Sequence, residues 1–315
     1  MALVDLSIVI VTRNTCALLC AALRSAMESR DAFTKRIIVV DNGSTDDTTL
    51  VVRREFPAVK LVCAPRNLGF ARANNLGAKE AEGEWLLLLN SDARLKPDTL
   101  TAAVDWMRQH PECGVCGGQL LDLDGTPQNS IANAPSLATE LLNKSLLRRI
   151  FPTRFPGKEN RSREPLEVES VIGAFMLIRR VVWLDLGGLD ERYFFFLEET
   201  DFCVQARQHG WKVYHLPQVE VWHEQGQSAA QTPLAARIEY WRSRYLYFQK
   251  HYGRLPRGVL HAGLLLRLLV SWLVSGLLTG LTLGRLKHSR ERWRICTALW
   301  RWHLSGRPDS MGLPR

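Results

Sequence analysis

The chain has few cysteines for its length, and their spacing does not indicate a metal site. Seven cysteines are spread over 315 residues. Cys113 and Cys116 form a C-x-x-C pair, but no second Cys or His pair follows at the spacing of a zinc site. The short apolar start is interrupted by Asp5 and has no basic segment before it, so no secretory signal is visible. We therefore expect a reducing compartment and a packing role for this pair.

Acidic residues are scarce in the last third of the chain. Residues 226–315 hold 15 Lys and Arg against 3 Asp and Glu, whereas residues 1–225 hold 26 against 29. This asymmetry indicates an anionic partner for the last third, either a membrane surface or a nucleic acid. The sequence contains no nucleic-acid-binding motif, and the aromatic residues of this region lie among aliphatic ones. An anionic membrane surface is thus the favoured partner, and no nucleic acid is expected.

The rest of the composition is that of a folded protein. Hydrophobic residues make up 46% of the chain and charged residues 23%, which does not suggest disorder. The length suffices for one large domain of about 200–250 residues and an appendage.

Apolar segments alternate with segments of helical pattern from the start of the chain. The run from Trp85 to Leu89 is too short for a helix and is typical of a strand buried on both faces. Similar strands are expected at 6–12, 36–40, 59–63 and 113–120, with helices at 15–29, 46–55, 70–82 and 97–109. Such alternation predicts an α/β fold with a parallel sheet and right-handed crossovers.

Polar residues follow several of these strands directly. Because parallel strands end at the same sheet edge, we expect Thr12, Asp41, the loop 66–69 and Asp92 to lie around one ligand-binding crevice. Asp41 could bind a base or ribose, or form an Asx-turn that caps the next helix, and the sequence favours neither. Arg66, Arg72 and the pair Asn74-Asn75 are candidate phosphate contacts, and Gly69 would allow close backbone approach.

Six segments give the chain a recognisable resemblance: SIVIVTRN, VVDNGSTDDT, NLGFARANNLGAKEAEGEWLLLLNSD, VIGAFMLIRR, GGLDERYFFFLEETDFCVQAR and VYHLPQVEVWHEQGQS. In this order, over about residues 5–228, the chain closely resembles the inverting family-2 glycosyltransferases, particularly the bacterial rhamnosyltransferase-like branch. The resemblance implies a GT-A-type, Rossmann-like, mostly parallel sheet flanked by helices. It also implies a nucleotide-diphosphate sugar donor, dTDP-rhamnose above all, and a lipid-linked saccharide acceptor for cell-surface polysaccharide.

The resemblance places a divalent cation, Mg²⁺ or Mn²⁺, at the end of the strand 85–89. Asp92 matches the last position of the family's D-x-D-like motif, and Asn90 stands at the first, which leaves one anionic ligand fewer. His223 matches a His that is a further metal ligand in some relatives. The residues that the resemblance assigns to the nucleotide sugar are Thr12, Asp41, Asn67, Gly69, Arg72, Asn90, Asp92 and Gly173.

The resemblance places the catalytic base in the segment LEETDF. Inversion by single displacement requires a group that takes the proton of the acceptor hydroxyl. The family's base position is Glu199 here, where an Asp is usual, so Glu198 is the alternative. Asp201 more simply caps or orients the helix expected over 200–209.

The part after residue 235 is interpreted as a separate basic and apolar extension (236–315), following the catalytic domain 1–235. A helix is expected over 235–252. As a helix the uncharged run 268–284 would extend about 26 Å, short of the roughly 30 Å hydrocarbon core, and Arg267 precedes it. A re-entrant or interfacial anchor at the cytoplasmic face of the plasma membrane is favoured over a span, and a soluble helical hairpin remains open.

Two further points concern function. Residues 122–168 lack periodicity apart from a helix-like piece at 137–150, and they are interpreted as an acceptor-side loop, a lid or a disordered insert. A nucleotidyltransferase would need a Gly-rich, Lys-bearing loop where Thr12-Arg13-Asn14 stands. A UDP-sugar-dependent transferase with another acceptor, or a non-catalytic nucleotide-sugar-binding protein, remains an alternative.

Overall fold

The computed structural model describes residues 4–151, 154, 163–224 and 233–315. Part of the segment 122–168 and the last four residues of the resembling region, 225–228, lie outside the described residues. The chain divides into two compact units. The first comprises Met1–Ala134, Phe151–Gln227 and Arg315, and the second comprises Pro135–Ile150 and Ser228–Pro314. The structure thus groups residues 135–150 with the C-terminal helices.

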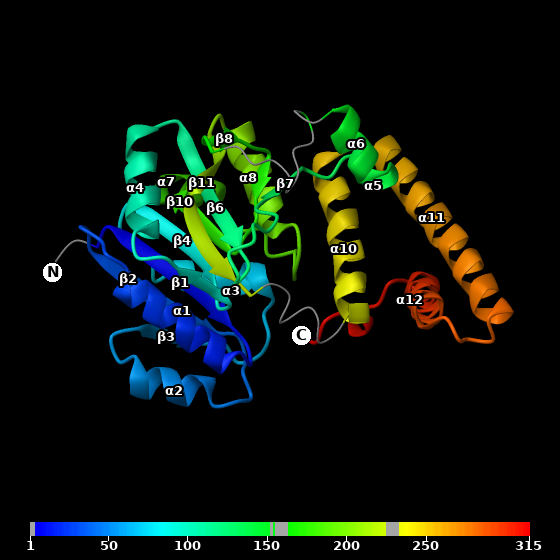
Figure 1. Ribbon diagram of the computed structural model, residues 1–315, viewed down its shortest axis with the longest axis horizontal. Coiled ribbons are helices and arrows are strands. Elements are labelled where there is room, and N and C mark those ends of the chain that lie inside the picture. Colours follow the sequence, from blue (N-terminus) through cyan, green and yellow to red (C-terminus); the bar gives the residue numbers. More distant parts are fainter. Residues whose placement is uncertain (1–3, 152–153, 155–162, 225–232) are drawn as a thin grey trace. The chain divides into compact units, whose positions relative to one another are not determined.

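The first unit begins with the alternation that the sequence predicts (Figure 1). Its elements are β1 (Leu6–Thr12), α1 (Cys16–Glu28), β2 (Lys35–Asp41), α2 (Thr48–Glu55), β3 (Lys60–Cys63), α3 (Phe70–Ala78) and β4 (Trp85–Asn90). Helix α3 ends at Ala78 and not near residue 82, because tight turns from Gly77 and Ala78 replace the helical hydrogen bonds. Gly83 then allows close backbone passage, since a Cβ there would lie 2.4 Å from the carbonyl oxygen of Val4.

The second half of this unit adds strands that the sequence analysis did not locate. After β5 (Ala93–Leu95), α4 (Thr99–Gln109) and β6 (Cys113–Leu121) come β10 (Phe175–Arg179), α7 (Arg180–Leu186), α8 (Glu198–Gln208) and β11 (Lys212–His223). Over the described residues the sheet has nine strands in the order β3-β2-β1-β4-β10-β6-β11-β5, with β8 (Leu166–Glu167) beside β11. Strands β1 to β4 are parallel, and β10 runs antiparallel between β4 and β6. The predicted α/β sheet flanked by helices is confirmed.

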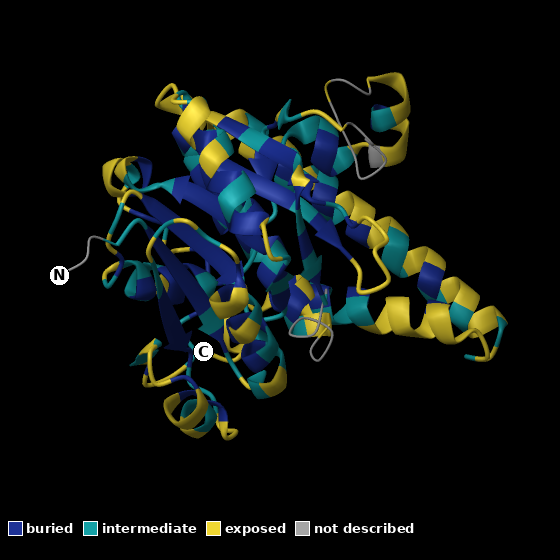
Figure 2. Cartoon of the chain, turned by 60° about the vertical axis from the view of Figure 1, so that its left-hand side comes forward, coloured by how far each residue is buried: buried dark blue, intermediate teal, exposed yellow. Residues whose placement is uncertain are grey.

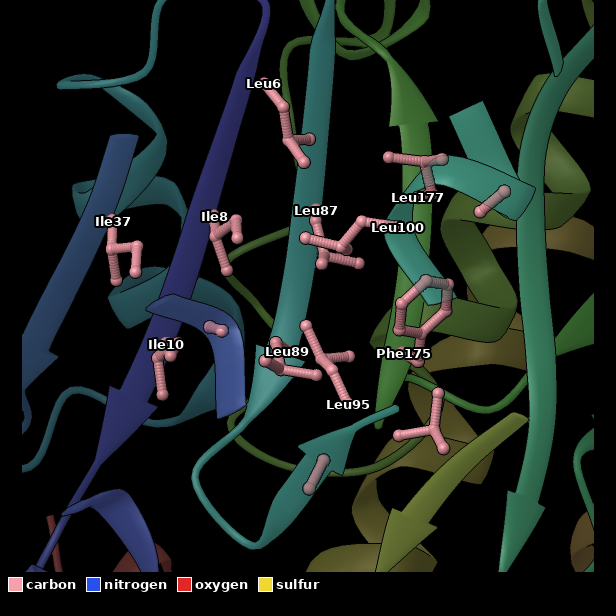
Figure 3. Packing of buried hydrophobic residues seen from close by; sticks show 14 of the residues in the cluster. Leu6, Ile8, Ile10, Ile37, Leu87, Leu89, Leu95, Leu100, Phe175 and Leu177 are labelled. Carbon is pink, nitrogen blue, oxygen red and sulfur yellow. The ribbon is translucent and has the colours of Figure 1, made fainter. Parts of the chain in front are cut away.

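The sheet has a hydrophobic core on each face. Side chains of β4 alternate, so that Leu87 and Leu89 pack with α1 and α4, while Leu86 and Leu88 pack with α3, α7 and α8. Figure 3 shows the first of these clusters, with Leu87 and Leu89 among residues of β1 and β10. Because both faces are covered, β4 consists wholly of apolar residues until Asn90. Cys113 and Cys116 are buried free thiols in this core, as predicted.

The segment 122–168 contains only short elements where it is described. Strand β7 (Ile131–Ala132) pairs with β9 (Ser170–Val171), and the helix-like piece 137–150 forms two helices, α5 (Leu137–Leu141) and α6 (Lys144–Ile150). The helices are separate because Asn143 Oδ1 accepts hydrogen bonds from the backbone amides of Ser145 and Leu146, which caps α6.

The second unit is helical. Besides α5 and α6 it contains α10 (Pro233–His251), α11 (Arg254–Leu281), α12 (Lys287–Leu304) and the short 3-10 helix η1 (Asp309–Met311). Arg244 of α10 forms a buried ion pair with Glu140 of α5 at 3.1 Å, and Arg267 donates to the Glu140 carbonyl oxygen. Helix α11 includes Arg267 and begins at Arg254, well before the uncharged run 268–284. It is the one described helix long and apolar enough to cross a membrane, and only 17% of its most apolar 18-residue stretch is buried.

The core of the first unit generates a prediction about stability. Leu87 is fully buried in the centre of the sheet, so Leu87→Ala should lower the free energy of unfolding by about 2–5 kcal/mol. Leu50→Ala on α2, where the side chain is 66% exposed, should change it by less than about 0.5 kcal/mol. Urea unfolding followed by circular dichroism measures both. Equal losses in the two variants would contradict the packing described above.

Candidate functional site

The carboxyl ends of β1, β2 and β4 lie beside one another at one edge of the sheet. Thr12 is opposite Asp41, and Val11 is opposite Asn90. Hydroxyl groups connect these ends, since Thr12 Oγ1 lies 2.9 Å from Thr15 Oγ1, which lies 3.1 Å from Ser91 Oγ. The sheet therefore brings Thr12, Asp41, Asn90 and the start of the Asn90-Ser91-Asp92 segment together, as the sequence predicts.

Asp41 forms the turn contact that the sequence left open and keeps one carboxylate oxygen without a partner among the described residues. Its Oδ2 accepts a hydrogen bond of 3.3 Å from the Ser44 amide, which is the turn-forming contact. Its Oδ1 is buried and has no hydrogen-bond partner among the described residues. A buried acceptor without a donor is costly in a folded protein, so Oδ1 is suited to accept a hydrogen bond from a ligand hydroxyl or amide.

The loop 66–69 is held by Asn42, which the sequence analysis named only as part of a polar turn. Asn42 Oδ1 accepts from the Leu68 amide at 2.7 Å, and its Nδ2 donates to Asn67 Oδ1 at 3.0 Å. Gly69 has φ +82°, and a Cβ there would lie 2.4 Å from the carbonyl oxygen of Phe194. Gly69 thus permits a close approach to Phe194, whose carbonyl oxygen also accepts a hydrogen bond of 2.7 Å from the Phe70 amide.

Three of the candidate phosphate contacts have partners within the protein. Arg72 Nε lies 3.5 Å from Glu191, and both side chains are about half exposed. Asn75 binds the Leu189 backbone through both its amide nitrogen and its oxygen, and Asn74 donates to the Phe70 carbonyl oxygen. These contacts orient α3 against the segment before α8.

Asp92 and His223 face each other across a short strand pair. Strand β5 pairs with β11 so that His223 lies opposite Ala93, and the Glu224 amide donates to the Asp92 carbonyl oxygen at 2.9 Å. His223 Nε2 is 3.4 Å from Asp92 Oδ1, and their side chains are 7% and 13% exposed. The two residues are 131 positions apart in sequence and were both predicted as metal ligands.

The donor set of this pair suits a divalent cation in part. Imidazole nitrogen and carboxylate oxygen are common ligands of Mn²⁺. Among the described residues no group of three or more His, Cys, Asp or Glu side chains is placed to hold a metal ion. A cation at Asp92 and His223 would thus need further ligands from a bound substrate or from water.

Gln128 contacts His223 and was missed by the sequence analysis. It lies in the irregular segment after β6, is 7% exposed, and its Oε1 is 3.0 Å from His223 Nδ1. A single polar residue in a segment without periodicity gives no signal of such a role.

Glu199 lies beside the end of β4 on the other side of Asn90. The Asn90 amide donates to the Ala174 carbonyl oxygen at 3.0 Å, and the adjacent Gly173 contacts Glu199, whose Cβ and Cγ are each 3.6 Å from the position of a Cβ built on Gly173. Glu199 Oε2 is buried and has no hydrogen-bond partner among the described residues. Burial raises the pKa of Glu199, and the backbone amides of Glu199, Thr200 and Gly173 oppose this increase.

The start of α8 presents these carboxylates. Phe196 and Leu197, immediately before Glu198, have φ of 75° and 68°, a left-handed conformation that is unfavourable for side chains of this size. Glu198 is 3% exposed. Asp201 accepts hydrogen bonds from Tyr193 Oη at 3.3 Å and Gln205 Nε2 at 2.8 Å. Asp201 therefore orients the helix, as the sequence interpretation favoured.

Comparisons with known proteins agree with this arrangement. The sequence profile of glycosyl transferase family 2 matches residues 7–186. The chain is 29% identical over 251 residues to an N-acetylglucosaminyl-diphospho-decaprenol L-rhamnosyltransferase of Mycobacterium tuberculosis, covering 73% of this chain and 81% of that protein. It is 23% identical over 221 residues to the dTDP-rhamnosyl transferase RfbF of Shigella flexneri, covering 69% and 68%.

A solved structure shows the same fold. The mannosyltransferase PcManGT from Pyrobaculum calidifontis, in complex with GDP-Man and Mn²⁺, aligns with a TM-score of 0.56 at 18% identity, over 94% of this chain and 85% of that chain. The GT-A-like architecture expected from the sequence is thereby confirmed.

The buried carboxyl of Glu199 generates a prediction about pH. With a pKa raised above the ordinary unfolded value of about 4.3, it lowers stability progressively as the pH rises from there through the folded pKa. Glu199→Gln removes this charge, so it should raise Tm at pH 7 by a few degrees and have little effect near pH 4. Thermal melts between pH 4 and 8 measure the difference.

The control is Glu80→Gln, whose side chain is 41% exposed and forms a surface ion pair with Lys60. It should change Tm little at any pH. A Glu199→Gln variant that melts lower than the wild-type protein by the same amount at pH 4 and pH 7 would contradict the burial described for Glu199.

Proposed function

Since the chain belongs to glycosyl transferase family 2, we propose that it transfers rhamnose, with inversion, from dTDP-rhamnose to a lipid-linked saccharide during synthesis of a cell-surface polysaccharide. The observation that carries this proposal is that Asp92 with His223, and Glu199 with Gly173, lie next to the end of the same strand, β4. Two relatives whose names specify rhamnosyl transfer, one of them to a diphospho-decaprenol-linked sugar, support the choice of donor and acceptor.

The residues divide into three groups by role. Asp41, through its unpartnered Oδ1, and Thr12 bind the nucleoside, with Asn67, Gly69 and Asn90 beside them. Asp92 and His223 would hold a divalent cation, Mg²⁺ or Mn²⁺, and such an ion would supply positive charge to the leaving diphosphate. The GT-A neighbour solved with GDP-Man and Mn²⁺ supports a cation with a nucleotide sugar in this fold.

Glu199 is the proposed base. Its Oε2 has no hydrogen-bond partner among the described residues and is therefore available to accept the proton of the acceptor hydroxyl. A carboxylate with a raised pKa is a stronger base than an ordinary Glu and is still largely ionised when the pH exceeds that pKa. Gly173, next to it, leaves room for the reacting sugar because it has no side chain. Glu198, whose side chain lies deeper, is the weaker candidate.

We also propose that α11 lies in the interface of an anionic membrane. Apart from Arg267 and Gly280, the exposed residues between 266 and 281 are aliphatic: Leu266, Leu269, Val270, Leu273, Val274, Leu277, Leu278 and Leu281. Figure 2 shows the long helix as largely exposed. The opposite face carries the polar residues Ser271, Ser275 and Thr279, whose hydroxyls bond to Arg292 of α12 or to the α11 backbone.

A helix on the surface of a water-soluble protein buries its apolar face, whereas α11 exposes its aliphatic face. Each aliphatic side chain transferred from water into lipid contributes about 1.5–3 kcal/mol. Exposed cations of α12, among them Arg290, Arg294 and Arg301, add up to about 1 kcal/mol each near anionic lipid. One face of α11 is already covered by α12 and α5, so an interfacial position on the cytoplasmic leaflet suits it better than a span.

The chemistry is tested by transfer assays on purified variants. Asp92→Asn and Glu199→Gln should each lower kcat/KM by at least about 100-fold, because each removes a group that acts in the transition state. The control Asp201→Asn changes a carboxylate of the same helix turn without removing the base. Transfer should also stop in excess chelator and return with Mn²⁺. Full activity of Glu199→Gln, or of the chelated enzyme, would contradict the mechanism.

If the protein binds nucleotide sugars without transferring them, Mn²⁺ and dTDP-rhamnose would raise its Tm and no product would form. If another donor is used, a UDP-sugar would give the larger increase in Tm. Either result would replace the proposed reaction.

Membrane association is tested by sedimentation with vesicles of phosphatidylethanolamine alone or with 30% phosphatidylglycerol. Wild-type protein should sediment with the anionic vesicles, and a triple variant with Leu273, Val274 and Leu277 changed to Gln should remain in solution with an unchanged Tm. The control is Leu304→Gln, at a side chain that is 82% exposed on α12. Equal sedimentation of the triple variant would contradict the interfacial role of α11, and resistance of the wild type to alkaline wash would indicate a span.

A further inference from the structure

The interaction between Asp92 and His223 depends on which ring nitrogen of His223 carries a hydrogen. His223 Nε2 and Asp92 Oδ1 are 3.4 Å apart and both nearly buried. If Nε2 carries a hydrogen, it donates to the carboxylate, and the two groups are then partners in one hydrogen bond. If Nε2 carries a lone pair, two acceptors face each other, and a cation between or beside them stabilises this arrangement. The position of one proton on His223 therefore decides what this site can bind.

Gln128 fixes that proton. Its side-chain Nε2 lies 2.6 Å from Asp122 Oδ1 and 2.6 Å from the His223 carbonyl oxygen. Both partners are acceptors only, so the atom between them must be the amide nitrogen, with its two hydrogens. The other amide atom, 3.0 Å from His223 Nδ1, is then the oxygen. A flipped amide would oppose oxygen to oxygen at two contacts.

The backbone of Gln128 is fixed as well. Its amide donates to the Leu120 carbonyl oxygen at 2.8 Å, and its own carbonyl oxygen accepts from Gln119 Nε2 at 3.0 Å. The residue is 7% exposed, and one orientation of its side chain satisfies all of its contacts.

An amide oxygen accepts hydrogen bonds and cannot donate them, so His223 must carry its hydrogen on Nδ1 to satisfy this contact. The lone pair of the neutral ring is then on Nε2, directed toward Asp92. A metal-ligating His commonly donates its second ring nitrogen to such a partner, which fixes the tautomer and the ring orientation.

We propose that Gln128 is a positioning residue that holds His223 in the Nδ1–H tautomer and so keeps Nε2 and Asp92 Oδ1 together as ligands for a divalent cation. Without Gln128, the stronger acceptor beside the ring is the Asp92 carboxylate, and the hydrogen moves to Nε2 to donate to it. Asp92 and His223 would then form an ordinary hydrogen bond, and Nε2 would no longer offer a lone pair to a cation. This inference rests on the cation in the proposed function, but it concerns a proton position that exists in the metal-free protein.

The direct test is ¹⁵N NMR of the histidine rings in metal-free full-length protein at about pH 8.5, because ¹⁵N shifts distinguish the two neutral tautomers and the doubly protonated ring. The His223 resonances are assigned by their loss in His223→Asn. We expect a protonated-type Nδ1 and an unprotonated-type Nε2. A hydrogen on Nε2 in the wild-type protein would overturn the proposal, whatever the enzyme activity.

Two substitutions separate the acceptor from the rest of the side chain. Gln128→Met keeps the length but removes the acceptor, so the hydrogen should move to Nε2, and the midpoint for binding Mn²⁺ alone, measured by electron paramagnetic resonance, should rise about 10–100-fold. Gln128→Glu keeps an acceptor beside Nδ1, and its second oxygen must take up a proton to donate to Asp122 or to the His223 carbonyl oxygen. In that form the Nδ1–H tautomer should remain. An unchanged tautomer and Mn²⁺ midpoint in a folded Gln128→Met protein would overturn the proposal.

The matched control is Gln119→Met, which removes a similar amide that bonds to Gln128 and Ser130 and does not contact the ring. It should leave the tautomer and the Mn²⁺ midpoint unchanged even if Tm falls. If Gln119→Met changes both as strongly as Gln128→Met, the effect comes from loosening of the segment and the proposal fails. If the tautomer is as expected and no sugar is transferred, the proposed function fails and the positioning role stands.

Discussion

Strand β4 is hydrogen-bonded along its length to β1 on one side and β10 on the other, and the geometry of the site depends on that double pairing. Pairing with β1 and, beyond it, β2 places Asn90 opposite Val11, one residue before the level of Thr12 and Asp41. Pairing with β10 places Ala174 at Asn90, and therefore Gly173 and Glu199 beside it. Because each side chain of β4 belongs to one of two packed cores, a shift of register by one residue would exchange the cores, so the register is strongly fixed.

The site retains polar atoms that the fold does not satisfy. Asp41 Oδ1 and Glu199 Oε2 are buried without partners among the described residues, and Phe196 and Leu197 hold an unfavourable backbone conformation before Glu199. Each such feature costs stability, about 1–3 kcal/mol for each strained residue. The cores on the two faces of the sheet offset this cost.

Much of the fold could be predicted from the sequence because each signal was local. Runs such as Leu6–Thr12 and Trp85–Leu89 are apolar because both faces are covered, and polar residues mark where each strand ends. The antiparallel strand β10 could not be placed, since an apolar run gives no information on the direction or partner of a strand. The same holds for β5, three residues long, whose pairing with β11 brings Asp92 to His223.

Only those residues of the candidate site that lie in sequence motifs could be named from the sequence. Asp92, His223 and Glu199 were found through motifs, whereas Gln128 lies in a segment without periodicity and contacts His223 only through the folded chain. Arg72 was expected at a phosphate and stays a prediction, whereas its ion pair with Glu191, 119 residues later, could not be read from the sequence. The start of α11 was missed because the apolar segment was ended at the charged residue Arg267. In the structure Arg267 lies within the helix, and its guanidinium donates to the Glu140 carbonyl oxygen of α5.

The central claim is that Asp92, His223 and Glu199 serve one reaction centre at the end of β4. The most direct measurement is a crystal structure of the protein with Mn²⁺ and dTDP, with the ion located from its anomalous scattering. The account predicts Mn²⁺ bonded to Asp92, to His223 Nε2 and to the diphosphate, with the Glu199 carboxylate facing the same cleft. An ion bound without Asp92 and His223, or a Glu199 carboxylate directed into a different cavity, would contradict it.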